Sequence, residues 1–281
     1  MLAILLAATS AACSVANAPV PSYPQTDVSA LAVQSAALGR PMPVLVFRPR
    51  NFDATRPFAL LYLFHGFGSD QSVWFDGHGG DGVHADGMAQ ALIDEGRICP
   101  VVIASAFIAN SYGVDSQPAN DQFDHGPYAR YLAEDLLPAV ETSLGYRGGA
   151  THRFVGGLSM GGFAALHVAL TRPAWFAGVG ALSPAAFVST PTDRQWLFDG
   201  NAAVNDPMLL ASTADVTGLR VFLGNGDSDY GWVRDGAREI AKRLSQRGLH
   251  VTPMVVPGGH DGGTWRQLTG PMLENLLAPP C

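Results

Sequence analysis

The chain has 281 residues, of which 47% are hydrophobic and only 15% charged, enough apolar material for one large buried core. Its formal net charge of −7 comes without any basic run, which argues against a nucleic-acid partner. No internal repeat is visible, so we expect one globular domain.

The N-terminus predicts an export signal. Residues 1–12 are small and apolar, too short to span a bilayer but suited to the core of such a signal. Two kinds of processing remain open, namely cleavage after Ala-Asn-Ala at residues 16–18 or lipidation of Cys13. Either predicts a secreted or cell-envelope protein, with membrane contact only through a lipid on Cys13. A buried N-terminal helix is the alternative.

The segment after the signal has the composition of a linker, since three of its first six residues are prolines. We therefore expect an export signal in residues 1–18, a linker in residues 19–34 and one folded domain in residues 35–281. Within that domain, Cys99 and Cys281 are candidates for a disulfide in an oxidising compartment. A buried free Cys99 is the alternative.

Along the folded domain, apolar segments alternate with helix-forming ones. The predicted strands are residues 44–47, 58–64, 101–107, 154–155, 178–182, 221–223 and 251–256, most of them continuous apolar runs typical of strands buried on both faces. The predicted helices are residues 87–95, 128–144, 161–170, 233–247 and 265–277. This alternation predicts an α/β fold with a mainly parallel central sheet flanked by helices on both faces. Ligands in such folds bind beyond the carboxyl ends of the strands, where the following motifs lie.

A nucleophile elbow is predicted at residues 157–161, which read Gly-Leu-Ser-Met-Gly between an apolar strand and a helix. Such a sharp turn strains the serine backbone, and side chains at Gly157 and Gly161 would collide across it. Ser159 is therefore expected to stand exposed at a helix N-terminus, where the helix dipole favours developing negative charge. A chance match to so short a pattern is the competing interpretation, and the flanking strand and helix argue against it.

A glycine-bearing loop at residues 65–70 follows an earlier predicted strand and is able to aim backbone N–H groups at a substrate oxygen. In the fold that the elbow indicates, this loop supplies one oxyanion-hole donor and the residue after the nucleophile supplies the other. We assign them to the backbone N–H groups of Phe67 and Met160. His65 is predicted to fix the loop through hydrogen bonds rather than to take part in catalysis.

The general base is expected on the glycine loop after the last predicted strand, where His260 is the best placed of the eight histidines. The acid should precede it in sequence, on the loop after the strand at residues 221–223. Spacing alone leaves Asp227 and Asp229 as alternatives. We prefer Asp229, because it lies nearer the next helix and leaves Asp227 to cap the turn. Asp235 ranks third.

With these segments in place, the chain resembles the esterase D-like family of α/β-hydrolases over about residues 35–278. The segments that carry the resemblance are the strand into the oxyanion loop at residues 58–66, the helix at residues 131–138, the elbow, and the Pro-Gly-Gly-His-Asp sequence at residues 257–261. Feruloyl esterases, S-formylglutathione hydrolases and mycolyltransferases belong to that family. The resemblance implies the α/β-hydrolase fold and the same nucleophile, base, acid loop and oxyanion donors.

A loop rich in Gly, Asp and His at residues 74–86 follows the oxyanion turn. Its histidines and aspartates could bind a metal, but their spacing matches no metal motif, and we predict a substrate-facing rim. Trp74 in this loop is predicted to supply apolar contact to the substrate. Trp232 after the acid loop and Trp265 after His260 are expected to line the same cleft, with core packing as the alternative for these two. The expected chemistry needs no metal or organic cofactor.

These motifs predict a serine carboxylic-ester hydrolase that acts through a Ser-His-Asp triad and an acyl-enzyme on an extracellular or envelope ester. The substrate would be a small-molecule, polysaccharide or lipid ester. An acyltransferase of the mycolyltransferase type is the alternative, because residues 224–226, Gly-Asn-Gly, resemble the corresponding loop of those enzymes. A non-catalytic carbohydrate-binding protein on the same scaffold is a third possibility, which the intact triad set disfavours.

Overall fold

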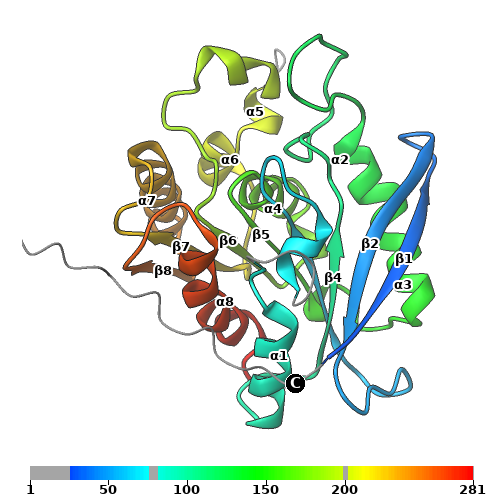
Figure 1. The fold of residues 1–281 in the computed structure, drawn as a ribbon. Helices are drawn as coiled ribbons and strands as arrows, with labels where there is room; N and C mark the ends of the chain where they lie inside the picture. The colour runs from blue at the N-terminus through cyan, green and yellow to red at the C-terminus, as the bar shows by residue number, and fades with distance from the viewer. Residues whose placement is uncertain (1–25, 76–81, 199–201, 281) are drawn as a thin grey trace, which may run out of the picture.

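One central sheet organises the protein (Figure 1). The computed structural model describes residues 26–75, 82–198 and 202–280. The strands within these ranges are β1 (Asp27–Ser35), β2 (Arg40–Arg48), β3 (Ala59–Phe64), β4 (Val101–Ala106), β5 (Arg153–Leu158), β6 (Gly178–Leu182), β7 (Arg220–Gly226) and β8 (Val251–Val256). Their order in the sheet is β1-β2-β4-β3-β5-β6-β7-β8. From β4 to β8 all neighbours run parallel, whereas β1 and β2 join antiparallel at one edge.

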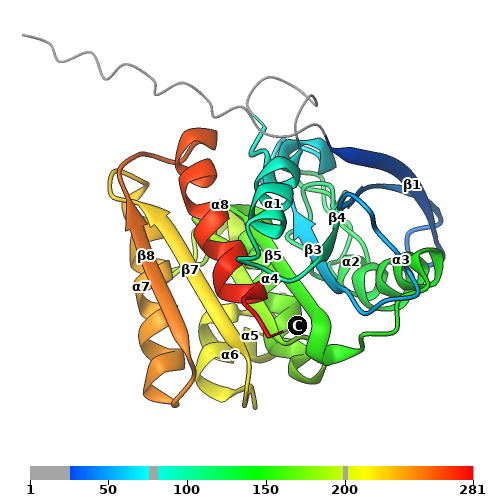
Figure 2. The same cartoon turned by 90° about the horizontal axis from the view of Figure 1, so that it is seen from below.

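Helices cover both faces of this sheet. They are α1 (Ala85–Asp94), α2 (Tyr128–Arg130), α3 (Leu137–Leu144), α4 (Met160–Thr171), α5 (Ala202–Asn205), α6 (Pro207–Thr213), α7 (Gly231–Gln246) and α8 (Gly262–Leu277). Helices α1 and α8 lie side by side over one face (Figure 2), and α3, α4, α6 and α7 contribute to the core on the other. The predicted α/β-hydrolase architecture is thereby confirmed.

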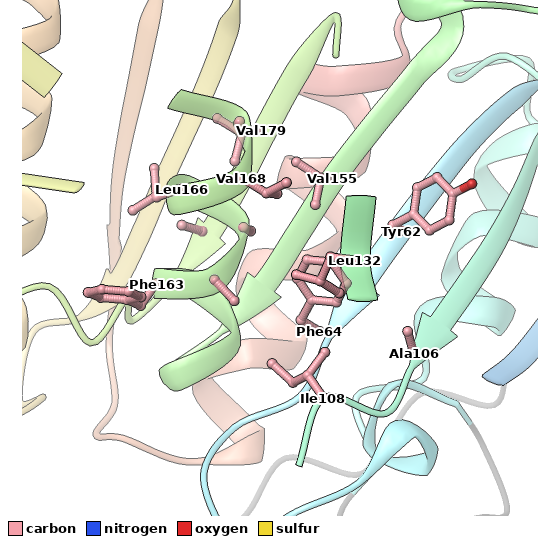
Figure 3. Close-up of a cluster of buried hydrophobic side chains, with 14 of the residues drawn as sticks. Tyr62, Phe64, Ala106, Ile108, Leu132, Val155, Phe163, Leu166, Val168 and Val179 are labelled. Carbon is pink, nitrogen blue, oxygen red and sulfur yellow. The ribbon is translucent and has the colours of Figure 1, made fainter. Parts of the chain in front are cut away.

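The inner strands have no solvent face, as their continuous apolar runs predicted. Every residue of β3, β4 and β6 is buried. On the side of α4, Phe163 and Leu166 of that helix belong to the same hydrophobic cluster as Val155 of β5 and Val179 of β6 (Figure 3). Burying such side chains stabilises the fold by roughly 1.5–3 kcal/mol each, so the sheet and α4 together form a rigid support for the loops at the strand ends.

The prediction of a linker through residue 34 is wrong, because residues 27–35 form the edge strand β1. This strand pairs with β2 along its whole length, and Val33 is buried in the core. Small residues, among them Ala30 and Ala32, hide the alternation of the strand in the sequence. The folded domain therefore begins before residue 35.

The helices differ from prediction mainly at their ends. The predicted helix at residues 128–144 is a run of α2, a π-helical segment (Tyr131–Leu136) and α3. Helix α8 begins at Gly262, where the side chain of Asp261 accepts a hydrogen bond from Thr264 N at 3.0 Å. Helix α6 was not predicted, although Asp206 followed by Pro207 is a helix-start signal.

The predictions for the two ends of the chain lie largely outside the described residues. The export signal, with Cys13, and the last residue, Cys281, are among these. Cys99 is disulfide-bonded, so the buried free thiol that was its alternative is excluded. In the part of the chain that the structure describes, no helix is long and apolar enough to cross a bilayer.

Candidate active site

The residues at 157–161 form the sharp strand-to-helix turn that the sequence predicted. Ser159 follows β5 directly, caps the N-terminus of α4 and has φ 53° and ψ −117°. A Cβ atom at Gly157 would lie 2.1 Å from Gly161 O, and one at Gly161 would lie 2.1 Å from Phe64 O. Glycine is therefore required at both positions, at Gly161 because the turn packs on the end of β3.

Three predicted residues meet at the carboxyl edge of the sheet. The Nε2 atom of His260 lies 2.9 Å from Ser159 Oγ, and its Nδ1 atom lies 2.8 Å from Asp229 Oδ1. Since an ionised carboxylate only accepts, Nδ1 carries the hydrogen and Nε2 accepts from the serine hydroxyl. The arrangement leaves a base in contact with the nucleophile and an acid behind the base.

The side chain of Asp229 is fully buried. Burial acts to raise the pKa of this carboxyl, but the hydrogen bond with His260, the neighbouring Ser183 hydroxyl, the charge of His260 and the Tyr230 N–H outweigh it and hold the pKa below its ordinary value. The Tyr230 N–H lies 2.7 Å from Asp229 Oδ1. The carboxylate therefore remains ionised and can stabilise a positive charge that develops on His260.

The structure brings Asp229, not Asp227, to His260. Asp227 is exposed, and its Oδ1 atom accepts from Gly258 N at 3.1 Å and from Ser228 Oγ at 2.9 Å. These hydrogen bonds tie the loop after β7 to the loop that carries His260. Asp227 thus holds the loop in place and does not contact the imidazole.

The loop at residues 65–70 lies against the elbow, since a Cβ atom at Gly66 would be 3.4 Å from the Cβ of Ser159. Among the described residues, no acceptor is bound by the backbone N–H of Phe67 or of Met160. Both groups belong to segments that flank Ser159, as expected of donors to a substrate oxygen. Gly68 N donates to Asn110 Oδ1 at 2.8 Å, which anchors the loop.

His65 anchors this loop through hydrogen bonds of its buried ring. Burial lowers its pKa to about 4, so the ring is neutral. The Nδ1 atom lies 2.8 Å from Gly66 O, and Nε2 accepts from Ile108 N at 3.1 Å. These contacts match the structural role predicted for His65 and place it outside the reaction.

The two tryptophans that the sequence offered as substrate contacts have different environments. Trp74 is completely buried, and its indole N–H donates to Phe64 O at 3.1 Å, so its prediction as a substrate-facing residue is wrong. It packs in the core under α1 and α8. Trp232 is 43% exposed at the start of α7. Of the rim predicted at residues 74–86, residues 76–81 lie outside the described ranges.

A row of aromatic rings runs outward from His260. Tyr230 lies 5.1 Å from the imidazole between ring centroids, Trp232 lies 6.1 Å from Tyr230 with nearly parallel planes, and Phe187 stacks on Trp232 at 5.0 Å. Tyr230 is 57% exposed. We call Phe187, Tyr230 and Trp232 the aromatic row. Only Trp232 was predicted, because a tyrosine beside an aspartate in a turn carries no sequence signal for a rim.

A second group of rings lies on the side of the oxyanion loop. The ring of Phe67 is 42% exposed and packs edge-on against Phe123 at 5.5 Å, and Phe123 in turn contacts Trp196 at 5.1 Å. The guanidinium of Arg194 lies 4.3 Å from the Phe123 ring centroid. Apolar groups therefore flank the serine on both sides.

No group of three or more His, Cys, Asp or Glu side chains suited to a metal ion occurs within residues 26–75, 82–198 and 202–280.

Comparison with known proteins agrees with the fold. A family model described as "Putative esterase" matches residues 35–276. The "Endo-1,4-beta-xylanase/feruloyl esterase" of Xylanibacter ruminicola is 24% identical over 222 residues, which make up 78% of this chain and 26% of that protein. The chain thus spans about a quarter of the length of this relative.

Solved structures show the same fold. A ferulic acid esterase superposes with a TM-score of 0.76 at 22% identity, covering 91% of this chain and 99% of the other. The S-formylglutathione hydrolase of Agrobacterium tumefaciens superposes with a TM-score of 0.70 at 17% identity, covering 92% and 99%. The elbow on an α/β-hydrolase sheet defines a protein of the serine-hydrolase class. Because the family model covers most of the chain, the protein belongs to the family that the model describes as "Putative esterase".

Proposed function

We propose that the protein hydrolyses carboxylic esters through a covalent acyl-enzyme on Ser159. The observation that carries the proposal is the continuous hydrogen-bonded arrangement from Ser159 through His260 to the buried Asp229. His260 lies within hydrogen-bonding distance of both Ser159 and Asp229. No substrate-induced movement is therefore needed to bring the nucleophile, the base and the acid together.

The reaction runs in two halves. His260 Nε2 takes the proton of Ser159 as Oγ attacks the ester carbonyl, and the Phe67 and Met160 N–H groups bind the oxyanion. His260 then gives the proton to the alcohol oxygen, which leaves. Water attacks the acyl-enzyme, passes its proton to His260, and the acid is released as that proton returns to Ser159. Throughout, Asp229 stabilises the imidazolium.

The essential test is Ser159→Ala. It should lower kcat on p-nitrophenyl esters by at least about 10³-fold, because no other group takes over the attack. The variant should also lose labelling by a serine-directed fluorophosphonate. A survey of p-nitrophenyl esters of increasing chain length, together with a hydroxycinnamate ester, defines which acyl group the enzyme accepts. Undiminished turnover in the variant would defeat the proposal.

The aromatic row supports a proposal for where the alcohol half of the ester binds. The leaving oxygen must receive its proton from His260, so the alcohol departs on the side of Tyr230 and Trp232. Their exposed rings offer apolar contact to a bulky alcohol there.

Trp232→Ala should therefore discriminate between alcohols. We expect kcat/KM to fall about 10-fold for a p-nitrophenyl ester but to change little for the methyl ester of the same acid, since methanol does not reach the row. Both esters carry the same acyl group, and kcat/KM reports only the steps up to the acyl-enzyme, so the comparison isolates the alcohol. An equal loss of kcat/KM for the two esters would contradict the proposal that the alcohol binds on this side.

Acyl transfer to a sugar or lipid alcohol uses the same first half-reaction. Nothing in the described site favours an alcohol over water as acceptor, so hydrolysis is the proposed outcome. Analysis of products with and without an added alcohol separates the two. We propose further that the protein acts outside the cytoplasm, for which the apolar residues 1–12 are the support, and fractionation of cells expressing the full chain tests it.

A further inference from the structure

A buried serine stands at the end of β6, between the strands that carry the nucleophile and the acid. Ser183 follows β6 directly and has φ 47°, a left-handed conformation that is uncommon for a residue with a side chain. It is completely buried, and its N–H donates to Gly224 O of β7 at 2.6 Å. Strained backbone at such a place is usually held for a purpose, and a buried hydroxyl requires partners.

One partner of that hydroxyl is Trp265, at the start of α8. The indole N–H donates to Ser183 Oγ at 3.1 Å. Because an indole N–H can only donate, Oγ is the acceptor in this contact, and the hydroxyl hydrogen of Ser183 is left for another group.

The acid offers a place for that hydrogen. Asp229 uses Oδ1 for His260, whereas its buried Oδ2 makes no hydrogen bond of ordinary geometry to the described residues. Ser183 is nevertheless close enough to help hold the pKa of Asp229 low. A donor with a free hydrogen therefore lies beside a buried carboxylate oxygen that has room for one.

We propose that Ser183 is a positioning residue that fixes Asp229, its hydroxyl accepting from Trp265 and donating to Asp229 Oδ2. This inference rests on the proposed function. With both oxygens held, the carboxylate cannot turn away from His260 Nδ1. Trp265 supports the same pair from the other side, since its ring meets the imidazole edge-on at 5.3 Å.

The segment that contains Ser183 also holds the nucleophile. Ser159 N donates to Leu182 O at 2.8 Å, and Ala185 N donates to Ser159 O at 2.9 Å. We call residues 182–185 the β6 clamp. The clamp thus contacts the backbone of Ser159 and, through Ser183, the side chain of Asp229.

Other titratable or charged groups near the pair are accounted for by their own partners. Asp227 and Asp261 accept from backbone N–H groups, Arg234 donates to the Asp227 carbonyl, and Tyr230 packs against the imidazole. None of these side chains is hydrogen-bonded to Asp229 or His260 within the described residues. Substitution of Ser183 is therefore the most direct way to change the surroundings of the Asp229 carboxylate.

Ser183→Ala tests the proposal, because it removes only the hydroxyl. Alanine, like serine, places a Cβ atom in the left-handed backbone conformation at this position. We expect kcat on a p-nitrophenyl ester to fall about 10-fold with KM unchanged, since Ser183 does not touch substrate. The acidic limb of the kcat/KM profile should move to lower pH by about half a unit. The reason is that a carboxylate free to turn away from His260 Nδ1 stabilises the protonated imidazole less strongly.

Trp265→Phe is the second variant, and it keeps an aromatic ring against His260. Without the indole donor, the limb should move in the same direction by less, and the double variant should add little to Ser183→Ala because both act through one hydroxyl. A profile of Ser183→Ala that superimposes on the parent's, with only a lowered Tm, would overturn the inference. Failure of the proposed function would give a different result. Either the parent protein would not hydrolyse esters, or Ser159→Ala would hydrolyse them as fast as the parent.

Discussion

Ser159 occupies a backbone conformation that few non-glycine residues adopt. A φ of 53° with ψ −117° is expected to cost about 1–3 kcal/mol, and two backbone hydrogen bonds to the β6 clamp hold it. The strain turns the side chain out of the strand and toward His260. Stability is thus given up at one residue so that the hydroxyl meets its base.

The acid is the residue whose identity is easiest to test. Asp229→Asn should lower kcat by about 10⁴-fold, because the amide favours the wrong imidazole tautomer and cannot balance its charge. Asp227→Asn is the matched control. It keeps an oxygen for Gly258 N and should stay within about 10-fold of the parent. Kinetics on one p-nitrophenyl ester compare them, and the reverse ranking would make Asp227 the acid.

At the scale of elements, four neighbouring strands each deliver one residue to the same edge. The order β5-β6-β7-β8 brings Ser159, Ser183, Asp229 and His260 into a row, although they span a hundred residues of sequence. Parallel strands make this possible, because all their carboxyl ends face the same way. The elbow then depends on how closely α4 can approach β3.

Gly161→Ala tests that approach. A methyl group 2.1 Å from Phe64 O forces α4 away from β3, and we expect a loss of roughly 3 kcal/mol in the free energy of unfolding, with loss of turnover. Gly231→Ala at the exposed start of α7 is the control. Its Cβ would meet nothing within 4 Å, so stability should rise by up to about 0.5–1 kcal/mol. Urea denaturation measures both, and an unchanged midpoint for Gly161→Ala would contradict the packing described.

How much could be predicted from the sequence depended on whether a feature is local. The elbow and the histidine loop are short patterns whose glycines and flanking strands are visible along the chain. Spacing could not choose between Asp227 and Asp229, because the choice depends on how two loops meet. Ser183 carries no local signal at all, since its role arises only when β6, β7 and α8 are neighbours.

The errors have the same origin. Trp74 precedes a glycine-rich segment in the sequence and was predicted as a rim residue, yet its side chain is buried in the core. The strand β1 was hidden by small residues and becomes evident only through its pairing with β2.

For the whole molecule, two buried histidines make stability sensitive to acid. Burial lowers the pKa of His65 and of His167 from the ordinary 6.5 to about 4. Between these values the unfolded chain binds protons that the folded protein does not. The full stability is therefore present above pH 6.5 and is lost as the pH falls toward 4, by a contribution of the order of 3 kcal/mol per histidine.

Denaturant titrations at steps of pH from 7 to 4 measure this loss. The variant His167→Gln should flatten the dependence by about half, because one of the two proton-binding sites of the unfolded chain is gone. His250→Gln, at an exposed position directly before β8, is the control for the loss of a histidine as such. Equal slopes for the parent and His167→Gln would show that the buried imidazole is not the source.

The β6 clamp has a consequence for motion. Because one short segment holds both the backbone of the nucleophile and the side chain of the acid, a thermal displacement of that segment carries the two together and preserves their separation. Inactivation on warming should then begin with the release of this segment, before the sheet itself melts. The amide hydrogens of Ser183 and Ala185 are bound to Gly224 O and Ser159 O. Their exchange with deuterated solvent would therefore report the integrity of the site without any substrate.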